Sequence, residues 1–115
     1  MVFKFGSLKV WQLAVDMADE IDLVACNFLP HELYSLASQI RRAANSICLN
    51  IVEGSTGLSN AEFKRFLQIA NRSALEVVSC LFLAKRPGYI DSIKFSDLYT
   101  KLETWGRMIQ SLLIH

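Results

Sequence analysis

Residues 38–76 read SQIRRAANSICLNIVEGSTGLSNAEFKRFLQIANRSALE and predict one helix, a tight turn and a second helix. In the first predicted helix, apolar residues recur at steps of three and four, which places them on one helical face: Leu36, Ile40, Ala44, Ile47 and Ile51. Gly54 stands where a helix commonly ends in a left-handed conformation. Ser59 and Glu62 form an S-x-x-E capping box, which predicts the start of the next helix.

A stripe of hydrogen-bonding side chains runs beside the apolar face at the same spacing: Gln39, Arg42, Ser46, Asn50 and Glu53. The second helix adds three more polar residues, which are Arg72, Ser73 and Glu76. We interpret these eight residues as a structural polar network, either buried or at a subunit interface. The candidate ion pairs are Arg42 with Glu76 and Arg72 with Glu53, because a carboxylate in the last turn of a helix favours a cationic partner. The alternative is a surface that binds a ligand or RNA.

The same spacing predicts helices on both sides of this hairpin. The expected helices cover residues 8–27, 31–53 and 60–85, and a fourth helix is capped by Ser96 and runs to the end of the chain. Short connections make successive helices antiparallel. The sequence therefore predicts an all-α, antiparallel up-down-up-down four-helix bundle, with residues 1–115 as a single domain.

The composition predicts self-association. The chain has 115 residues, of which 52% are hydrophobic, and a mean hydropathy of +0.29. Small domains have much surface for their volume, so surplus apolar residues indicate that part of this surface is covered. The helix expected at 60–85 is apolar over more than one face, which is typical of a helix buried on several sides. We therefore expect a homo-oligomer.

The net charge of +1 offers no strong attraction for nucleic acid or anionic lipid. The charges are nevertheless unevenly distributed. Residues 8–28 carry one lysine against four acids, a net charge of −3, and residues 59–86 carry five basic residues against two acids, a net charge of +3. One interpretation is that the acidic and basic helices pair, within or between subunits. The other is that the basic helix faces RNA or an acidic partner.

The residue types needed for catalysis or metal binding are scarce. The two histidines, His31 and His115, are far apart, and neither is placed to act as a base for Ser46, Ser73 or Cys48. The three cysteines are odd in number and set among apolar residues, as in proteins of a reducing compartment. We expect no catalytic site, metal, cofactor or small-molecule substrate. Apolar runs are interrupted well before the length of a membrane span, so we expect a cytoplasmic protein without membrane partners.

The hairpin resembles the signature of a small bacterial four-helix bundle family first noticed as proteins encoded by intervening sequences in 23S ribosomal RNA genes. The matching residues are Ser38-Gln39-Ile40-Arg41-Arg42-Ala43, Ser46-Ile47, Asn50-Ile51, Glu53-Gly54, Ser59, Glu62-Phe63, Arg65-Phe66-Leu67, Ile69-Ala70, Ser73 and Glu76. The similarity extends to Leu8-Lys9-Val10-Trp11 and to Gly88-Tyr89-Ile90, and so covers most of the chain.

The resemblance implies a ring-like homopentamer and a role that is not enzymatic. It implies first a protein associated with RNA or the ribosome, for which Arg41, Lys64 and Arg65 are the candidate phosphate contacts. Related proteins serve as accessory proteins of diversity-generating retroelements, where the bundle binds a reverse transcriptase and nucleic acid. Those accessory proteins are strongly basic, whereas this chain is nearly neutral. A scaffold that binds only proteins is the third possibility.

Overall fold

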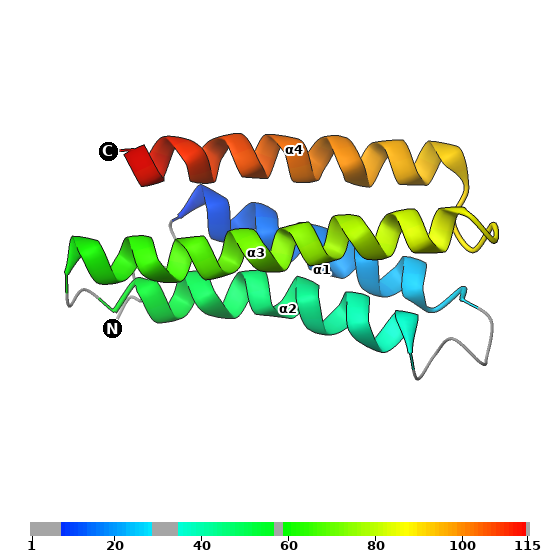
Figure 1. Ribbon diagram of the computed structural model, residues 1–115, viewed down its shortest axis with the longest axis horizontal. Helices are drawn as coiled ribbons and strands as arrows, with labels where there is room; N and C mark the ends of the chain where they lie inside the picture. Colours follow the sequence, from blue (N-terminus) through cyan, green and yellow to red (C-terminus); the bar gives the residue numbers. More distant parts are fainter. Residues whose placement is uncertain (1–7, 29–34, 57–58, 115) are drawn as a thin grey trace.

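A computed structural model describes residues 8–28, 35–56 and 59–114, and within these ranges the fold is all-α. Its four helices are α1 (Lys9–Ala25), α2 (Leu36–Gly54), α3 (Asn60–Lys85) and α4 (Ser92–Ile114). In Figure 1 the helix axes are roughly aligned, and the chain reverses its direction from each helix to the next. The prediction of an all-α fold with four helices is confirmed. The helix, turn and helix predicted for residues 38–76, which carry the polar stripe, correspond to α2 and α3.

Each helix packs against two others around one apolar core. The contacting pairs are α1 with α2, α2 with α3, α3 with α4, and α4 with α1. The acidic helix α1 and the basic helix α3 therefore lie on a diagonal and hardly touch. All five residues of the predicted apolar face of α2 are buried, and Trp105 fills the centre of α4 with no exposed surface. Its indole Nε1 donates a buried hydrogen bond of 3.0 Å to the carbonyl of Val10, which ties α4 to the start of α1.

Gly54 has a different role from the predicted left-handed helix end. It is the last helical residue of α2, and the positive φ within the described residues belongs to Gly88 instead, at +86°. A Cβ atom at Gly54 would lie 2.9 Å from Cβ of Phe66 and 3.3 Å from the carbonyl oxygen of Phe63. Glycine is therefore required because the backbones of α2 and α3 approach closely at this point.

The helix starts agree only partly with the sequence prediction. The Ser59 hydroxyl accepts from the backbone N–H of Glu62 at 3.0 Å, which confirms one half of the capping box. The Glu62 carboxylate instead accepts from Arg65 at 2.8 Å. The prediction that Ser96 caps the last helix is wrong, because Asp91 Oδ1 accepts from the N–H of Lys94 at 2.7 Å and α4 starts at residue 92. Helix α2 starts at residue 36, five residues after the predicted start, while residues 29–34 lie outside the described part.

Much of the apolar surface of α3 is not covered by the other described helices. By length and composition this helix could cross a membrane, since an 18-residue window in it has a mean hydropathy of 1.3. Only 33% of that window is buried in the bundle. Leu75 is 64% exposed, Leu83 is 52% exposed and Phe82 is 49% exposed. Leu75 and Phe82 lie beside α4, whereas Leu83 lies beside α2, so exposed apolar area is present along both sides of the outer part of α3. A further partner can bury this area.

We predict opposite effects of alanine at two helical glycines. Gly54→Ala should lower the free energy of unfolding by about 1–3 kcal/mol, because a methyl group forces α2 and α3 apart. Gly106→Ala should raise it by up to about 1 kcal/mol, because no atom lies within 4 Å of the added Cβ and alanine favours a helix. Urea denaturation followed by circular dichroism measures both effects. Equal stability of the Gly54→Ala variant and the natural protein would contradict the proposed close approach.

Candidate functional site

The polar stripe contains a small hydrogen-bonded centre between α2 and α3. The hydroxyl groups of Ser46 and Ser73 share a hydrogen bond of 2.9 Å across the two helices. The Asn50 amide donates to the carbonyl of Ser46 at 2.8 Å and to its hydroxyl at 3.0 Å. The hydroxyl of Ser73 also lies 3.2 Å from the carbonyl of Ile69. All these groups are partly buried, and they satisfy one another without a ligand.

The charged residues of the stripe lie at its margin in water. Arg42, Glu53, Arg72 and Glu76 are all exposed, and so is Gln39. Between the described residues of one chain, neither predicted ion pair occurs: Arg42 does not pair with Glu76, nor Arg72 with Glu53. Long charged side chains remain in water because the free-energy cost of removing their hydration exceeds the stabilisation from an ion pair of imperfect geometry. The stripe thus divides into a satisfied centre and four charged residues, Arg42, Arg72, Glu53 and Glu76, that form no ion pair with another described residue.

The three candidate phosphate contacts do not form one cluster. Arg41 points toward α1, where its Nε lies 2.7 Å from Asp22 Oδ1 and its Nη2 lies 3.2 Å from Cys26 Sγ. It precedes Gly54 by 13 residues, which is about 20 Å along α2. Lys64 and Arg65 lie in the first turns of α3, next to the end of α2. The structure therefore brings Lys64 and Arg65 together and places Arg41 apart from them.

Arg65 is also partly neutralised. Its guanidinium pairs with Glu62 at 2.8 Å and lies 4.6 Å from the centre of the Phe66 ring. The hydrogen bond from Arg65 lowers the pKa of the Glu62 carboxyl, so this acid remains charged beside it. Lys64, in contrast, forms no ion pair within the described part of the chain. Of the three residues, Lys64 is the cation most available to an external phosphate group.

Two of the three cysteines, Cys48 and Cys80, offer little nucleophilic chemistry. Burial raises the pKa of the Cys48 thiol to about 11, and burial also raises the pKa of Cys80. Both thiols therefore stay protonated at neutral pH, and a protonated thiol is a poor nucleophile and metal ligand. The described residues contain no group of three side chains suited to hold a metal ion. His31 and His115 lie outside the described residues.

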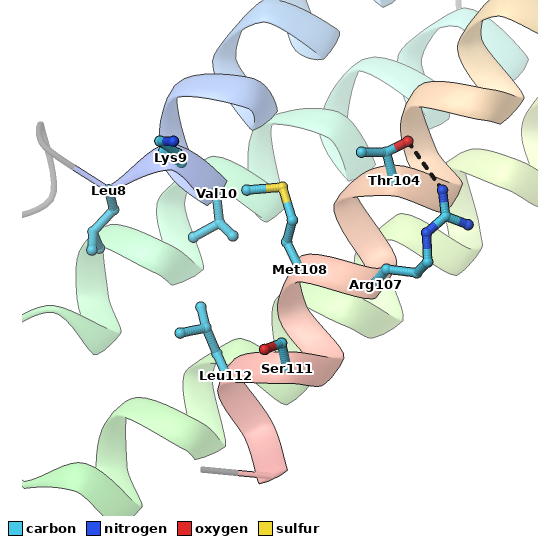
Figure 2. A pocket seen from close by; sticks show the side chains of 8 residues that line it. All are labelled: Leu8, Lys9, Val10, Thr104, Arg107, Met108, Ser111 and Leu112. Carbon is cyan, nitrogen blue, oxygen red and sulfur yellow. Dashed lines mark hydrogen bonds between the residues drawn. The ribbon is translucent and has the colours of Figure 1, made fainter.

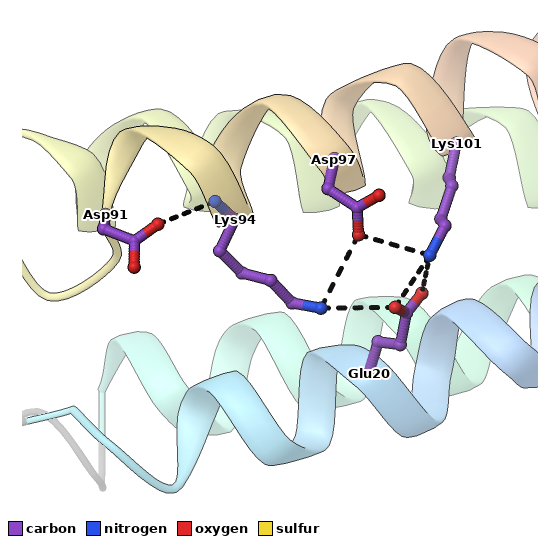
Figure 3. Close-up of polar contacts among 5 residues, drawn as sticks. All are labelled: Glu20, Asp91, Lys94, Asp97 and Lys101. Atoms are coloured by element: carbon purple, nitrogen blue, oxygen red, sulfur yellow. Dashed lines mark hydrogen bonds and ion pairs between the residues drawn. The ribbon is translucent and has the colours of Figure 1, made fainter.

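An ion cluster between α1 and α4 was not predicted from the sequence (Figure 3). Lys101 Nζ lies 2.7 Å and 2.8 Å from the two carboxylate oxygens of Glu20, and Lys94 Nζ lies 3.2 Å from one of them. Asp97 stands between the lysines on α4, at 3.6 Å from Lys94 and 3.2 Å from Lys101. The steps of three and four from residue 94 to residue 101 were a visible signal of one charged face, but nothing in the sequence identified Glu20 as its partner.

The cluster shifts the pKa of its carboxyl groups. Burial alone would raise the pKa of Glu20, but the hydrogen bonds and charges of Lys101 and Lys94 outweigh it and lower the pKa from 4.5. The hydrogen bond from Lys101 likewise lowers the pKa of Asp97. Both acids therefore remain charged in the folded protein at pH values where an unfolded chain begins to bind protons. The cluster joins two helices that are far apart in the sequence.

A groove of about 510 Å³ lies between the start of α1 and the end of α4 (Figure 2). Four apolar side chains line it: Leu8, Val10, Met108 and Leu112. The Arg107 guanidinium at its border turns to Thr104, whose hydroxyl lies 3.4 Å away. A substrate pocket normally contains several convergent polar groups, whereas this groove presents mainly apolar atoms. It resembles an interaction surface more than a catalytic pocket.

Comparison with known proteins gives a family and a fold. The sequence model of one family, 23S rRNA-intervening sequence protein, matches residues 6–111. A solved structure with a TM-score of 0.83 is a protein of unknown function from the S23 ribosomal protein family, from Bacteroides thetaiotaomicron VPI-5482. Its sequence is 24% identical, and the alignment covers 90% of this chain and 97% of that chain, so the likeness concerns the fold. No curated protein matches the chain.

We predict that Glu20→Gln removes part of the acid sensitivity of the fold. Because the folded-state pKa of Glu20 lies below 4.5, its stabilisation is present above pH 4.5 and is lost as the pH falls through the folded pKa. At pH 7 the free energy of unfolding of the variant should be lower than that of the natural protein by up to about 1 kcal/mol, because the ion pairs are partly exposed to solvent. As the pH falls, the free energy of unfolding of the variant should decrease less than that of the natural protein.

Chemical denaturation between pH 3 and pH 7 tests this prediction. Glu103→Gln is the matched control, because Glu103 is exposed on α4 and forms no ion pair within the described residues. Identical pH profiles for Glu20→Gln and Glu103→Gln would contradict a role of the cluster.

Proposed function

Because the chain belongs to the 23S rRNA-intervening sequence protein family, we propose that it is a non-enzymatic scaffold that associates with RNA or the ribosome in the cytoplasm. In this proposal its antiparallel four-helix bundles assemble into a homo-oligomeric ring, with a pentamer as the expected form. The partner is RNA, and no small molecule, cofactor or membrane takes part.

The observation that carries the proposal is the uncovered apolar surface of α3. Three large apolar side chains on this helix are about half exposed or more. Transfer of apolar area from water stabilises an assembly by about 25 cal/mol per Å². Contact with other copies therefore gives this surface a stable environment. A ring would also repeat every exposed feature of the subunit around one axis.

The arrangement of charged groups supports a binding role rather than a catalytic one. The perturbed carboxyl groups of Glu20 and Asp97 are tied to lysines in a cluster that joins two helices. The buried thiols have raised pKa values, and the polar centre of Ser46, Asn50 and Ser73 is internally satisfied. None of these groups resembles a nucleophile beside a base. We therefore propose that the protein acts by positioning its partners.

Lys64 and Arg65 support a contact with RNA. They lie together at the start of α3, and Lys64 has no competing acid within the described part of the chain. Two cations per subunit attract phosphate only weakly, but a ring brings several pairs to one RNA molecule and their contributions add. Arg41 contributes less, because Asp22 already neutralises it at 2.7 Å.

Two alternatives remain distinct from this proposal. An accessory role in a diversity-generating retroelement would require contacts with a reverse transcriptase as well as nucleic acid, and the net charge of +1 gives it less support. A scaffold that binds only proteins is favoured by the ion pairs that occupy Arg41 and Arg65. Salt separates these classes, because binding to phosphate weakens steeply as salt rises and an apolar protein contact responds little.

We predict that the purified protein is an oligomer that gains mass with a short structured RNA at low salt and loses it at physiological salt. Lys64→Ala combined with Arg65→Ala should weaken RNA binding and reduce the slope of log K against log salt by about one for each lost phosphate contact. Light scattering with and without RNA gives the mass, and a salt titration gives the slope.

Lys85→Ala combined with Arg86→Ala is the matched control, because it removes the same charge from the other end of α3. Equal loss of binding in both variants would point to unspecific attraction by total charge. An oligomer indifferent to RNA at low salt would overturn the RNA role and leave the scaffold that binds proteins.

A further inference from the structure

The acidic and basic helices do not pair within one subunit. Residues 8–28 carry a net charge of −3 and residues 59–86 a net charge of +3. Yet α1 packs against α2 and α4, and α3 lies diagonally across the bundle from α1. The outer faces of these two helices therefore point in opposite directions. Within α1, Glu20 and Asp22 already pair with α4 and α2, which leaves Asp16 and Asp19. These remaining acids can meet the basic residues of α3 only between two molecules.

Both outer faces carry unpaired charges and exposed leucines. Asp16 and Asp19 on α1 are exposed and form no ion pair with another described residue, and the same holds for Arg72 on α3. Leu23, one turn after Asp19, is 69% exposed, and Leu75, one turn after Arg72, is 64% exposed. Each face thus combines a charged group with an apolar group in the same order along its helix.

Contacts between neighbouring helices indicate how far along the bundle Asp16 and Arg72 lie, starting with α1 and α2. Arg41 of α2 contacts Asp22 of α1 through a pair of 2.7 Å. The two helices run in opposite directions in Figure 1, so six residues back along α1 corresponds to six residues forward along α2. Asp16 therefore lies at about the height of Ile47.

The same step from α2 to α3 completes the register. Ser46 contacts Ser73 at 2.9 Å, and these helices also run in opposite directions. Ile47, one residue after Ser46, therefore lies at about the height of Arg72, one residue before Ser73. It follows that Asp16 and Arg72 lie at similar heights, within about two helical turns of each other, on opposite sides of one subunit.

We propose that the outer face of α1 packs against the outer face of α3 in a second copy of this chain, with Asp16 paired to Arg72 of the neighbouring copy. This inference rests on the proposed self-association and specifies its surfaces. Two different faces meet, so the contact is heterologous, and such contacts generate rings when the rotation closes. In a ring with its axis along the bundle, residues of equal height face each other. Leu23 then lies against the exposed apolar surface around Leu75 and Phe82.

Charge reversal with rescue tests the proposed pair. Asp16→Arg and Arg72→Asp should each weaken assembly at least tenfold in dissociation constant, because each places like charges opposite one another. The double variant, Asp16→Arg with Arg72→Asp, should recover assembly to within a few-fold of the natural protein. Light scattering over a range of concentrations measures the mass, and circular dichroism checks that each variant is folded.

A leucine pair provides the second measurement. Leu23→Ser should weaken assembly, whereas Leu49→Ser should not, because Leu49 is similarly exposed at 62% but lies on α2. If the natural protein is a monomer at all concentrations, both this inference and the proposed assembly are overturned. If it is an oligomer that neither reversal weakens, or whose reversals are not rescued in combination, the assembly stands and this contact is overturned.

Discussion

The close approach of α2 and α3 at Gly54 is the constraint on which the other helix positions depend. The Phe66 side chain occupies the space that a Cβ atom at residue 54 would need. The end of α2 therefore lies directly against the start of α3, and the hydroxyl contact between Ser46 and Ser73 maintains the same close spacing nearer the middle of both helices. Once this hairpin is formed, α1 and α4 have only its remaining apolar faces to cover. The hydrogen bond from Trp105 to Val10 and the ion cluster around Glu20 then join these two outer helices.

This arrangement leaves α3 exposed where it is most apolar. The helix is shared between two neighbours, and its third face meets water with Leu75, Phe82 and Leu83. In a monomeric bundle, the solvent-facing positions of a helix typically carry charged or polar residues. The surplus of apolar residues in the composition and the exposed apolar side chains in the structure therefore agree, and both support the proposed self-association.

The sequence predicted elements wherever a local pattern determined them. The apolar spacing from Leu36 to Ile51 and the cap at Ser59 are local, and both occur in the structure. The wrong predictions concerned choices among similar local signals: Asp91 rather than Ser96 caps α4, and Gly54 is needed for helix packing rather than for a left-handed turn. The cluster of Glu20 with Lys94 and Lys101 joins positions more than 70 residues apart. Spacing within one helix carries no information about such a partner, and so this contact required the structure.

The division of the polar stripe has the same physical origin. Ser46, Asn50 and Ser73 have short side chains that reach one another and nearby backbone carbonyls, whereas Arg42 and Glu76 have long side chains that reach water. The sequence placed all of them on one face but could not determine which ones the neighbouring helix would cover. The charges that remain unpaired on the stripe are balanced between cations and anions, and a balanced surface favours protein over a polyanion. The proposed contact with phosphate is therefore assigned to the start of α3, where Lys64 lies without a competing acid among the described residues. In the proposed assembly, self-association and RNA contact would use different parts of the same helix, so a ring could form without covering Lys64.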